Sequence, residues 1–272
     1  MWIAKDWKDY ELLDCGGGEK LERWDRQILV RPDPQAIWET DKGTRLWRGA
    51  TGRYSRSSSG GGHWDKGKLP ESWQVHYRDL TFQVKPMNFK HTGLFPEQAV
   101  NWDFAMEKIR NAGRPIRVLN LFAYTGTATC YAADGGVEET VTVDLSNTYL
   151  DWAERNMRQN GFVGPQHHFV RDDVLAWIRD QRQTRNRWDL IFVDPPTFSN
   201  SSKMGRRTWD VQRDHVELLA GVSRLLAQGG HAIFSCNLRG FRPETRKLAR
   251  AGVVLEDITA RTIPEDFARN QK

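Results

Sequence analysis

The sequence is poor in the features that mark secreted, membrane-spanning and metal-binding proteins. Its 272 residues include only three cysteines, Cys15, Cys130 and Cys236, which are far apart and odd in number. This usage predicts reduced thiols in a cytoplasmic protein, without a disulfide framework or a zinc site. No apolar run approaches the ~20 residues of a bilayer-spanning helix, and the residues after Met1 lack a signal-peptide stretch. We therefore expect no membrane association and no metal.

Two common nucleotide-binding patterns are also absent. The tract Ser57–Gly62 is rich in serine and glycine, but no Gly-Lys-Ser/Thr ending follows it, so it is not a phosphate-binding P-loop. The turn at Gly126 is not part of a Gly-x-Gly-x-x-Gly motif. A dinucleotide-binding fold is therefore disfavoured, although it is not excluded.

The composition is that of a globular and mildly basic protein. The chain is 39% hydrophobic and 28% charged, with a net charge of +5 and a pI of about 9.1. Its basic residues gather around Arg179–Arg187, Lys203–Arg213 and Arg239–Arg250, and two of these groups lie next to the predicted site. The charge permits nucleic-acid binding, but an ordinary solvated surface would look the same.

Residues 1–87 differ in texture from residues 88–272, which predicts two parts. The first part has frequent turn residues and short extended segments at 27–30, 74–77 and 80–84, so we expect a small strand-rich subdomain. It also holds seven tryptophans: Trp2, Trp7, Trp24, Trp38, Trp47, Trp64 and Trp73. Such residues can stack bases, but we expect them to fill the core of the small subdomain.

From about residue 97 the chain alternates helical and strand-like segments, which predicts an α/β fold. Apolar periodicity gives helices at 98–111, 128–133, 146–161, from 173 through 178, and one that carries Val216 to Leu226 and ends at Gly229-Gly230. The expected strands are 117–122, 140–143, 168–170, 189–193 and 232–235. Repeated strand–helix units of this length imply a parallel sheet with right-handed crossovers and helices on both faces.

Several polar side chains follow the ends of these strands, at the sheet edge where α/β proteins bind ligands. Asp144 ends the second strand, and its carboxylate can accept hydrogen bonds from both hydroxyls of a ribose. Asp172 and Asp173 follow the third strand. One of them can accept from an adenine amino group while the other caps the next helix, and Asp173 is the better candidate for the adenine.

The segment Asp194-Pro-Pro-Thr-Phe198 is the most specific pattern in the chain. Its prolines stiffen the backbone and remove donors. Oxygen atoms of this segment can then face a planar nitrogen, while Phe198 stacks on a base. Cys236 ends the next strand and is a candidate nucleophile toward C6 of a pyrimidine. A buried, inert cysteine is the favoured alternative, because no adjacent base lowers its pKa.

From residue 88 onward the chain resembles class I S-adenosylmethionine-dependent methyltransferases of the bacterial 23S ribosomal RNA group, in particular their guanine-N7 module. The matching stretches are His91–Phe95, Asn120–Gly126, Thr142–Ser146, Tyr149–Asn156, Asp194–Asn200, Asp210–His215, Arg239–Phe241 and Asp266–Asn270. The resemblance implies a Rossmann-like sheet, S-adenosylmethionine as cofactor, and large-subunit ribosomal RNA as partner. It also implies cofactor contacts from Phe95, Asn120, Phe122, Ala123, Tyr124, Thr125, Gly126, Asp144, Leu145, Asp173, Asp194 and Pro195.

The same resemblance places Asp194 and Phe198 at the base and implies direct, in-line methyl transfer to guanine N7. Three departures keep alternatives open. The N-terminal part is similar to an uncharacterised branch of the superfamily. Cys236 stands where the guanine-N7 module has asparagine, which keeps cytosine C5 methylation by Cys236 as a second hypothesis. The family's final antiparallel strand is not expected within this sequence, so a non-catalytic RNA-binding protein that retains the fold is a third.

Overall fold

The computed structural model describes residues 6–57, 61–200 and 208–262, and these fall into two compact units. One unit comprises Met1–Val100 together with Ile258–Lys272, and the other comprises Asn101–Asp257. The division lies within helix α2 (Ala99–Asn111). The boundary after residue 87 that the sequence predicts stays a prediction. The tract from 58 to 60 and the last matching stretch, Asp266–Asn270, lie outside the described residues.

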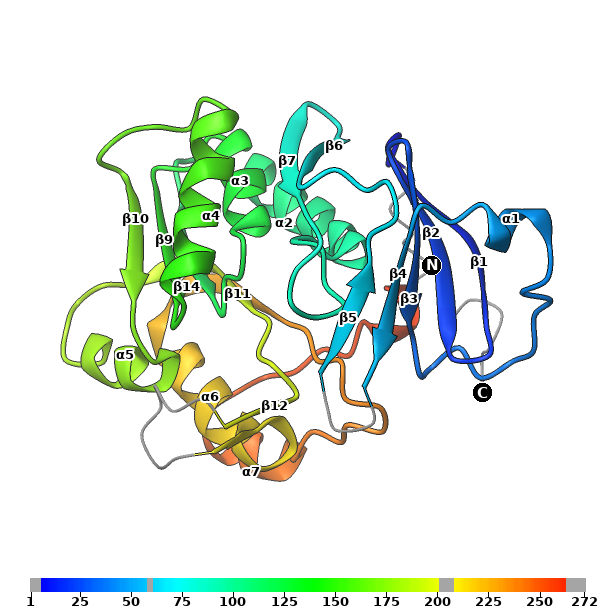
Figure 1. Ribbon diagram of the computed structural model, residues 1–272. Coiled ribbons are helices and arrows are strands. Elements are labelled where there is room, and N and C mark those ends of the chain that lie inside the picture. The colour runs from blue at the N-terminus through cyan, green and yellow to red at the C-terminus, as the bar shows by residue number, and fades with distance from the viewer. Residues whose placement is uncertain (1–5, 58–60, 201–207, 263–272) are drawn as a thin grey trace. The chain divides into compact units, whose positions relative to one another are not determined.

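The first unit is rich in strands (Figure 1). Its five-stranded sheet has the order β1-β2-β3-β4-β5, and only the β3–β4 pair is parallel. These strands are β1 (Tyr10–Gly16), β2 (Glu19–Trp24), β3 (Gln27–Pro32), β4 (Gly52–Arg56) and β5 (Gly62–Asp65), with the short helix α1 (Arg45–Arg48) before β4. A separate antiparallel hairpin joins β6 (Trp73–Tyr77) to β7 (Leu80–Val84), and the 3-10 helix η1 (Pro96–Gln98) precedes α2.

The tryptophans of this unit are packing residues. Trp24 and Trp47 are buried, and the other tryptophans described in this unit are half-buried. The indole of Trp47 donates to Asp14 Oδ2 at 2.8 Å, and that of Trp38 donates to the carbonyl of Cys15. The core position that the sequence predicts is therefore confirmed for Trp24 and Trp47, while Trp2 lies outside the described part of the chain.

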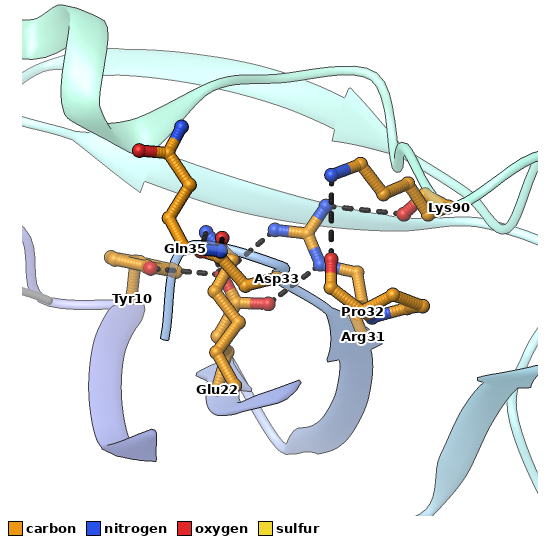
Figure 2. A network of polar contacts seen from close by, with 8 residues as sticks. Tyr10, Glu22, Arg31, Pro32, Asp33, Gln35 and Lys90 are labelled. Carbon is orange, nitrogen blue, oxygen red and sulfur yellow. Dashed lines mark hydrogen bonds and ion pairs between the residues drawn. The ribbon is translucent and has the colours of Figure 1, made fainter. Parts of the chain in front are cut away.

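A buried ion pair connects β2 and β3 (Figure 2). Arg31 donates to both carboxylate oxygens of Glu22, over 2.6 and 2.7 Å, and Tyr10 donates to the same carboxylate over 2.9 Å. Burial opposes the charge of Glu22, but Arg31 and Lys20 attract it, and with the hydrogen bonds they lower the pKa of Glu22 to about 2. Lys90 donates to the carbonyl of Pro32 and accepts from Arg31 through its own carbonyl. Ionised Glu22 therefore contributes to the stability of this unit.

The second unit has a parallel five-stranded sheet with the order β10-β9-β8-β11-β14. This order, with helices between the strands, confirms the predicted Rossmann-like α/β fold. The strands are β8 (Arg117–Leu121), β9 (Glu139–Asp144), β10 (His167–Arg171), β11 (Trp188–Val193) and β14 (Leu226–Phe234). The helices after α2 are α3 (Thr127–Asp134), α4 (Asn147–Gln159), α5 (Val174–Gln181), α6 (Val211–Leu225) and α7 (Thr245–Arg250), and η3 (Thr259–Arg261) follows in the first unit.

Strand alternation assigns these helices to the two faces of the sheet. Odd-numbered residues of the central strands, such as Leu119 and Ile191, join a cluster with the apolar residues of α5 and α6. Even-numbered residues point to the other face, where the buried Asn120 donates to Thr129 of α3 over 2.9 Å. The hydroxyls of Thr129 and Thr142 lie 3.0 Å apart, so one polar chain connects β8, α3 and β9.

The end of α6 differs from the sequence expectation. The helix stops at Leu225, and β14 begins at once at Leu226, whereas the pattern predicted a helix to Gly229-Gly230. The register against β11 shifts between Trp188 and Leu190, which face Leu226 and His231. The two glycines lie in this bulge, where Gly229 has φ +75°. They mark a bulge inside the strand rather than a helix end.

Candidate functional site

The candidate site lies at the carboxyl edge of the parallel sheet. Because β8, β9, β10, β11 and β14 are parallel, the residues that follow their last positions meet at one edge. The chain places there the turn 122–126, Asp144, the pair Asp172-Asp173, Asp194 and Cys236. Sequence and topology together thus gather most of the predicted site residues.

The turn after β8 has an unusual backbone. Phe122 and Tyr124 have φ of +56° and +51°, which side-chain-bearing residues rarely adopt, and Gly126 has φ +70°. A Cβ on Gly126 would lie 2.6 Å from Cβ of Ala153, so the glycine also permits close packing against α4. The buried Asn156 of α4 supports the turn by donating to the carbonyl of Thr125 over 2.9 Å. Backbone strain of this kind clusters at functional sites.

The turn holds the Asp144 carboxylate in place. The amide of Tyr124 donates to Asp144 Oδ2 over 3.0 Å, and the amide of Ser146 donates to Oδ1 over 2.8 Å. Each oxygen of an ionised carboxylate has more than one lone pair. Asp144 can therefore accept further hydrogen bonds from vicinal hydroxyls.

Tyr149 of α4 stands beside this carboxylate. Its ring meets Tyr124 edge to face, with centroids 4.8 Å apart. Burial raises the pKa of Tyr149 to about 12, and the charge of Asp144 adds to that rise. The phenol therefore stays protonated near Asp144. Sequence analysis did not select Tyr149 as a site residue, although it lies in one of the stretches that carry the family resemblance.

The two aspartates after β10 have different partners. Asp173 is the N-cap of α5, and its Oδ1 accepts from the amide of Ala176 over 2.9 Å. Asp172 Oδ1 accepts from the amide of Asp173, while the amide of Asp172 donates to the carbonyl of Asp144. The capping role thus belongs to Asp173, the residue that the sequence favoured for adenine, and Asp172 becomes the better candidate for that contact.

Asp194 directly follows the central strand β11. Its Oδ1 accepts from the hydroxyl of Ser235 over 2.6 Å, and the amide of Ser235 donates to the carbonyl of Val193. Asp194 is half-buried and Pro195 is buried. The carboxylate is therefore held at the strand end by Ser235, the residue that follows β14.

Phe198 begins the short strand β12 (Phe198–Ser199), which pairs with β13 (Trp209–Asp210). Its side chain is 56% exposed, although large apolar side chains are usually covered. The buried Trp209 supports the segment from below by donating to the carbonyl of Pro196 over 2.6 Å. The Trp209 ring also packs on Phe122, with centroids 5.9 Å apart. Trp209 therefore connects the segment of Phe198 with the turn after β8. Trp209 is a residue that sequence analysis missed.

Cys236 does not have the surroundings of a thiolate. Burial raises the pKa of its thiol, and the Asp194 carboxylate raises it further, although the amide of Leu238 donates to the sulfur over 3.4 Å. The side chain packs against the core cluster on the α5–α6 face. These surroundings agree with the inert cysteine that the sequence favoured.

The remaining predicted contacts are less direct. Asn120 is 5% exposed and its amide is bonded to Thr129, so it supports the turn from within the sheet. Leu145 is half-buried next to Asp144. Phe95 belongs to the other unit, where its ring meets His91 edge to face at 5.0 Å. The predicted contact between Phe95 and the cofactor stays a prediction.

The three basic groups have different positions. Arg182, Arg185 and Arg187 lie before β11, at the amino edge of the sheet. The group from Arg239 follows β14 and lies at the carboxyl edge. Residues 203–207 are outside the described part of the chain. One predicted basic group thus borders the site, and one lies at the opposite edge.

Comparison with known proteins decides the family. The profile described as "S-adenosylmethionine-dependent methyltransferase" matches residues 18–255. The chain belongs to this family of enzymes. Their cofactor is S-adenosylmethionine, as the sequence predicted.

Individual relatives agree with that family. "Ribosomal RNA large subunit methyltransferase K/L" from Vibrio campbellii is 41% identical over 206 residues, which are 76% of this chain and 28% of the relative. The chain thus spans less than a third of that protein's length. An "SAM Dependent Methyltransferase from Agrobacterium tumefaciens" is 28% identical and superposes with a TM-score of 0.78, over 87% of this chain and 76% of the other. A "putative methyltransferase complexed with SAH" shares the fold at 19% identity and a TM-score of 0.70, over 89% and 64%.

The residues of the carboxyl edge fit this cofactor. Both carboxylate oxygens of Asp144 are held in place and can accept from ribose hydroxyls. The amide of Asp172 donates to the carbonyl of Asp144, so the two aspartates are neighbours. Among the residues that the structure describes, no group of three His, Cys, Asp or Glu side chains is placed to hold a metal. None of the described helices combines the length and hydropathy needed to cross a membrane.

Proposed function

We propose that this methyltransferase acts on a base of large-subunit ribosomal RNA in the cytoplasm, with guanine N7 as the favoured acceptor. The observation that carries the proposal is the pairing of a fixed Asp194 carboxylate with an exposed Phe198 four residues later. A flat, nitrogen-bearing ring can stack on Phe198 while its polar edge faces the segment from Asp194. The relative from Vibrio campbellii, which carries a ribosomal RNA name, supports the same class of substrate.

In this proposal the cofactor is held by the turn and by acidic side chains of the same edge. Asp144 accepts from the ribose hydroxyls, and Asp172 accepts from the adenine amino group because Asp173 caps α5. When bound, S-adenosylmethionine supplies an electrophilic methyl group on its sulfonium. Phe122, Ala123 and the rest of the turn set the position of that group relative to the base.

The chain's own contribution to transfer is positioning. Guanine N7 carries a lone pair and needs no base to become a nucleophile. Phe198 orients the purine, and the Asp194 carboxylate faces the purine, whose ring gains positive charge as N7 is alkylated. Cytosine C5 would instead require a thiolate at Cys236, and burial together with Asp194 raises the pKa of that thiol. This observation favours guanine over the alternative acceptor.

The proposal is tested by methyl transfer from labelled S-adenosylmethionine to unmodified 23S ribosomal RNA, with the modified nucleosides separated by mass spectrometry. We expect 7-methylguanosine. Asp194→Ala should abolish transfer while the fold is kept, and the exposed Asp180→Ala on α5 serves as the matched control. Methylcytidine as the product would replace the guanine assignment. A chain that binds S-adenosylmethionine but labels no RNA would overturn the RNA substrate.

A further inference from the structure

The loop of residues 238–244, which follows β14, is hydrogen-bonded through its main chain to side chains of α6. Gln212 Nε2 donates to the carbonyl of Arg242 over 2.8 Å, and the amide of Arg242 donates to Gln212 Oε1 over 3.0 Å. The fully buried His215 accepts from the amide of Glu244 through Nε2, at 2.9 Å. Its Nδ1 faces the carbonyl of Gln212 at 2.9 Å and therefore carries the proton. Two residues of the Asp210–His215 stretch thus hold residues 238–244 in one shape.

An aromatic anchor completes this attachment. The Phe241 ring meets His215 edge to face at 5.0 Å and lies 5.7 Å from the Phe234 ring at the end of β14. With its backbone bonded and one ring inserted, the loop does not behave as an ordinary solvated connection. Both arginines of the loop, Arg239 and Arg242, are exposed.

The charges of Arg239 and Arg242 are not paired with any acidic group in the part of the chain that the structure describes. Within the described residues, neither guanidinium has an ion-pair or hydrogen-bond partner. Two other exposed cations nearby are paired: Arg213 with Asp214 at 2.7 Å and Lys247 with Glu244 at 2.6 Å. Residues 239–250 contain five basic side chains and one acidic side chain. The loop therefore presents positive charge on a rigid frame.

The loop also lies close to the reacting centre. Arg239 is three residues after Cys236, so its Cα lies within ~11 Å of the Cα of Cys236 even if the chain is fully extended. Cys236 in turn is near enough to Asp194 for that carboxylate to raise the pKa of its thiol. The distance of up to ~11 Å between Arg239 and Cys236 corresponds to one or two nucleotides along a single strand.

We infer that the loop of residues 238–244, held by Gln212 and His215, is the docking surface for phosphates of single-stranded RNA next to the target base; this inference rests on the proposed RNA substrate. Single-stranded RNA exposes its bases and its phosphates together, which suits a stacking ring beside fixed arginines. A rigid loop loses little conformational entropy on binding. Gln212 and His215 thus fix the backbone that carries Arg239 and Arg242 before RNA binds.

The test compares RNA binding by the whole chain and by a double variant, Arg239→Gln with Arg242→Gln. The probe is a fluorescein-labelled single-stranded RNA of about 12 nucleotides, a length typical of such sites, titrated at several salt concentrations. Each phosphate contact contributes ~0.7 to the slope of log affinity against log salt for a single strand. We expect the double variant to bind at least ~fivefold more weakly and to lose about 1.4 from that slope.

The matched control is Arg182→Gln with Arg185→Gln. It removes the same charge from two exposed arginines at the amino edge of the sheet, and it should retain the wild-type slope. A second variant, Gln212→Ala, keeps both loop arginines but releases the main chain of Arg242. It should weaken binding while the salt slope stays within about 0.5 of the wild type, because no charge is removed.

S-adenosylmethionine binding is measured for every variant and should not change. If the wild-type chain binds RNA and the loop variant matches the control, the loop inference is overturned while the RNA substrate stands. If the wild-type chain binds no RNA at low salt, the proposed substrate fails and the loop's partner fails with it.

Discussion

At the residue scale, the proposed cofactor contact depends on one carboxylate, that of Asp144. Both oxygens of Asp144 already accept from backbone amides, one of which comes from the strained turn at Tyr124. In the proposed function, this arrangement fixes the acceptor before the ribose binds and so reduces the entropy lost on binding. The nearby Tyr149 stays protonated, since burial and Asp144 raise its pKa.

Asp144→Ala should weaken S-adenosylmethionine binding by about 10- to 100-fold, because hydrogen bonds to a charged acceptor contribute ~1.5–3 kcal/mol. Isothermal titration calorimetry measures the effect, with S-adenosylhomocysteine as a second ligand. Asp180→Ala, a change at an exposed position, should bind as the wild type does. Equal affinities for the two variants would remove Asp144 from the site.

Cys236→Ala should leave methyl transfer within about threefold of the wild type, because a thiol with a raised pKa is a poor nucleophile. Initial rates with saturating RNA measure the effect. A loss of more than ~100-fold with normal cofactor binding would instead support the cytosine mechanism, in which the thiol forms a bond to the base.

At the element scale, the junction between β8 and α3 depends on one glycine. Gly126 combines φ +70° with a position from which a Cβ would lie 2.6 Å from Ala153 of α4. Its conformation is therefore required by the backbone and by the neighbouring helix alike. The cofactor contact of Gly126, which the family resemblance implies, stays a prediction.

Gly126→Ala should lower the free energy of unfolding by ~2–4 kcal/mol, from a left-handed backbone together with overpacking. Gly136→Ala is the matched control, since Gly136 has φ +79° but nothing within 4 Å of a Cβ. It should cost only ~1–2 kcal/mol. Urea denaturation of both variants gives the comparison, and equal losses would show that contact with α4 is unimportant.

At the scale of the whole molecule, both units bury apolar side chains, and the first unit adds a buried ion pair. The Asn101–Asp257 unit has a parallel sheet covered by apolar residues of its helices, as the cluster of Leu119 and Ile191 shows. The other unit contains the buried Glu22–Arg31 pair. In the same unit, burial together with Arg31, Lys90 and Lys20 lowers the pKa of His91 to about 3.

These shifts predict a loss of stability in acid. The pKa of His91 falls from 6.5 to about 3 and that of Glu22 from 4.5 to about 2, so the unfolded chain binds protons before the folded chain does. Stability should decline as the pH falls from about 6.5 towards 2, first through His91 and then through Glu22 as well. Urea denaturation followed by tryptophan fluorescence at pH 7, 5.5 and 4 is the measurement.

Glu22→Gln is the informative variant for this decline. It should destabilise the chain at neutral pH by ~3–5 kcal/mol, because it leaves the charge of Arg31 buried without its partner. Below pH 4.5 its stability should depend less steeply on pH than that of the wild type, since the contribution of Glu22 is removed while that of His91 remains. An unchanged pH dependence would show that Glu22 is not the group that titrates.

The sequence by itself determined the fold class and the family, and it predicted the sheet edge at which the candidate site lies. Alternating apolar strands and amphipathic helices admit few arrangements other than a parallel sheet, and parallel strands bring Asp144 and Asp194 to one edge. These inferences depend on local periodicity and on chain direction, which are written along the chain.

Only the tertiary structure decided which partner each side chain takes. It showed that Asp173 caps α5 and that the glycines after α6 lie in a bulge of β14. It also showed that Trp209 is bonded to the segment that carries Phe198. It also showed that Gln212 and His215 hold a loop some thirty residues further along the chain. Such contacts depend on distances between segments that are remote in sequence, and no local pattern records them.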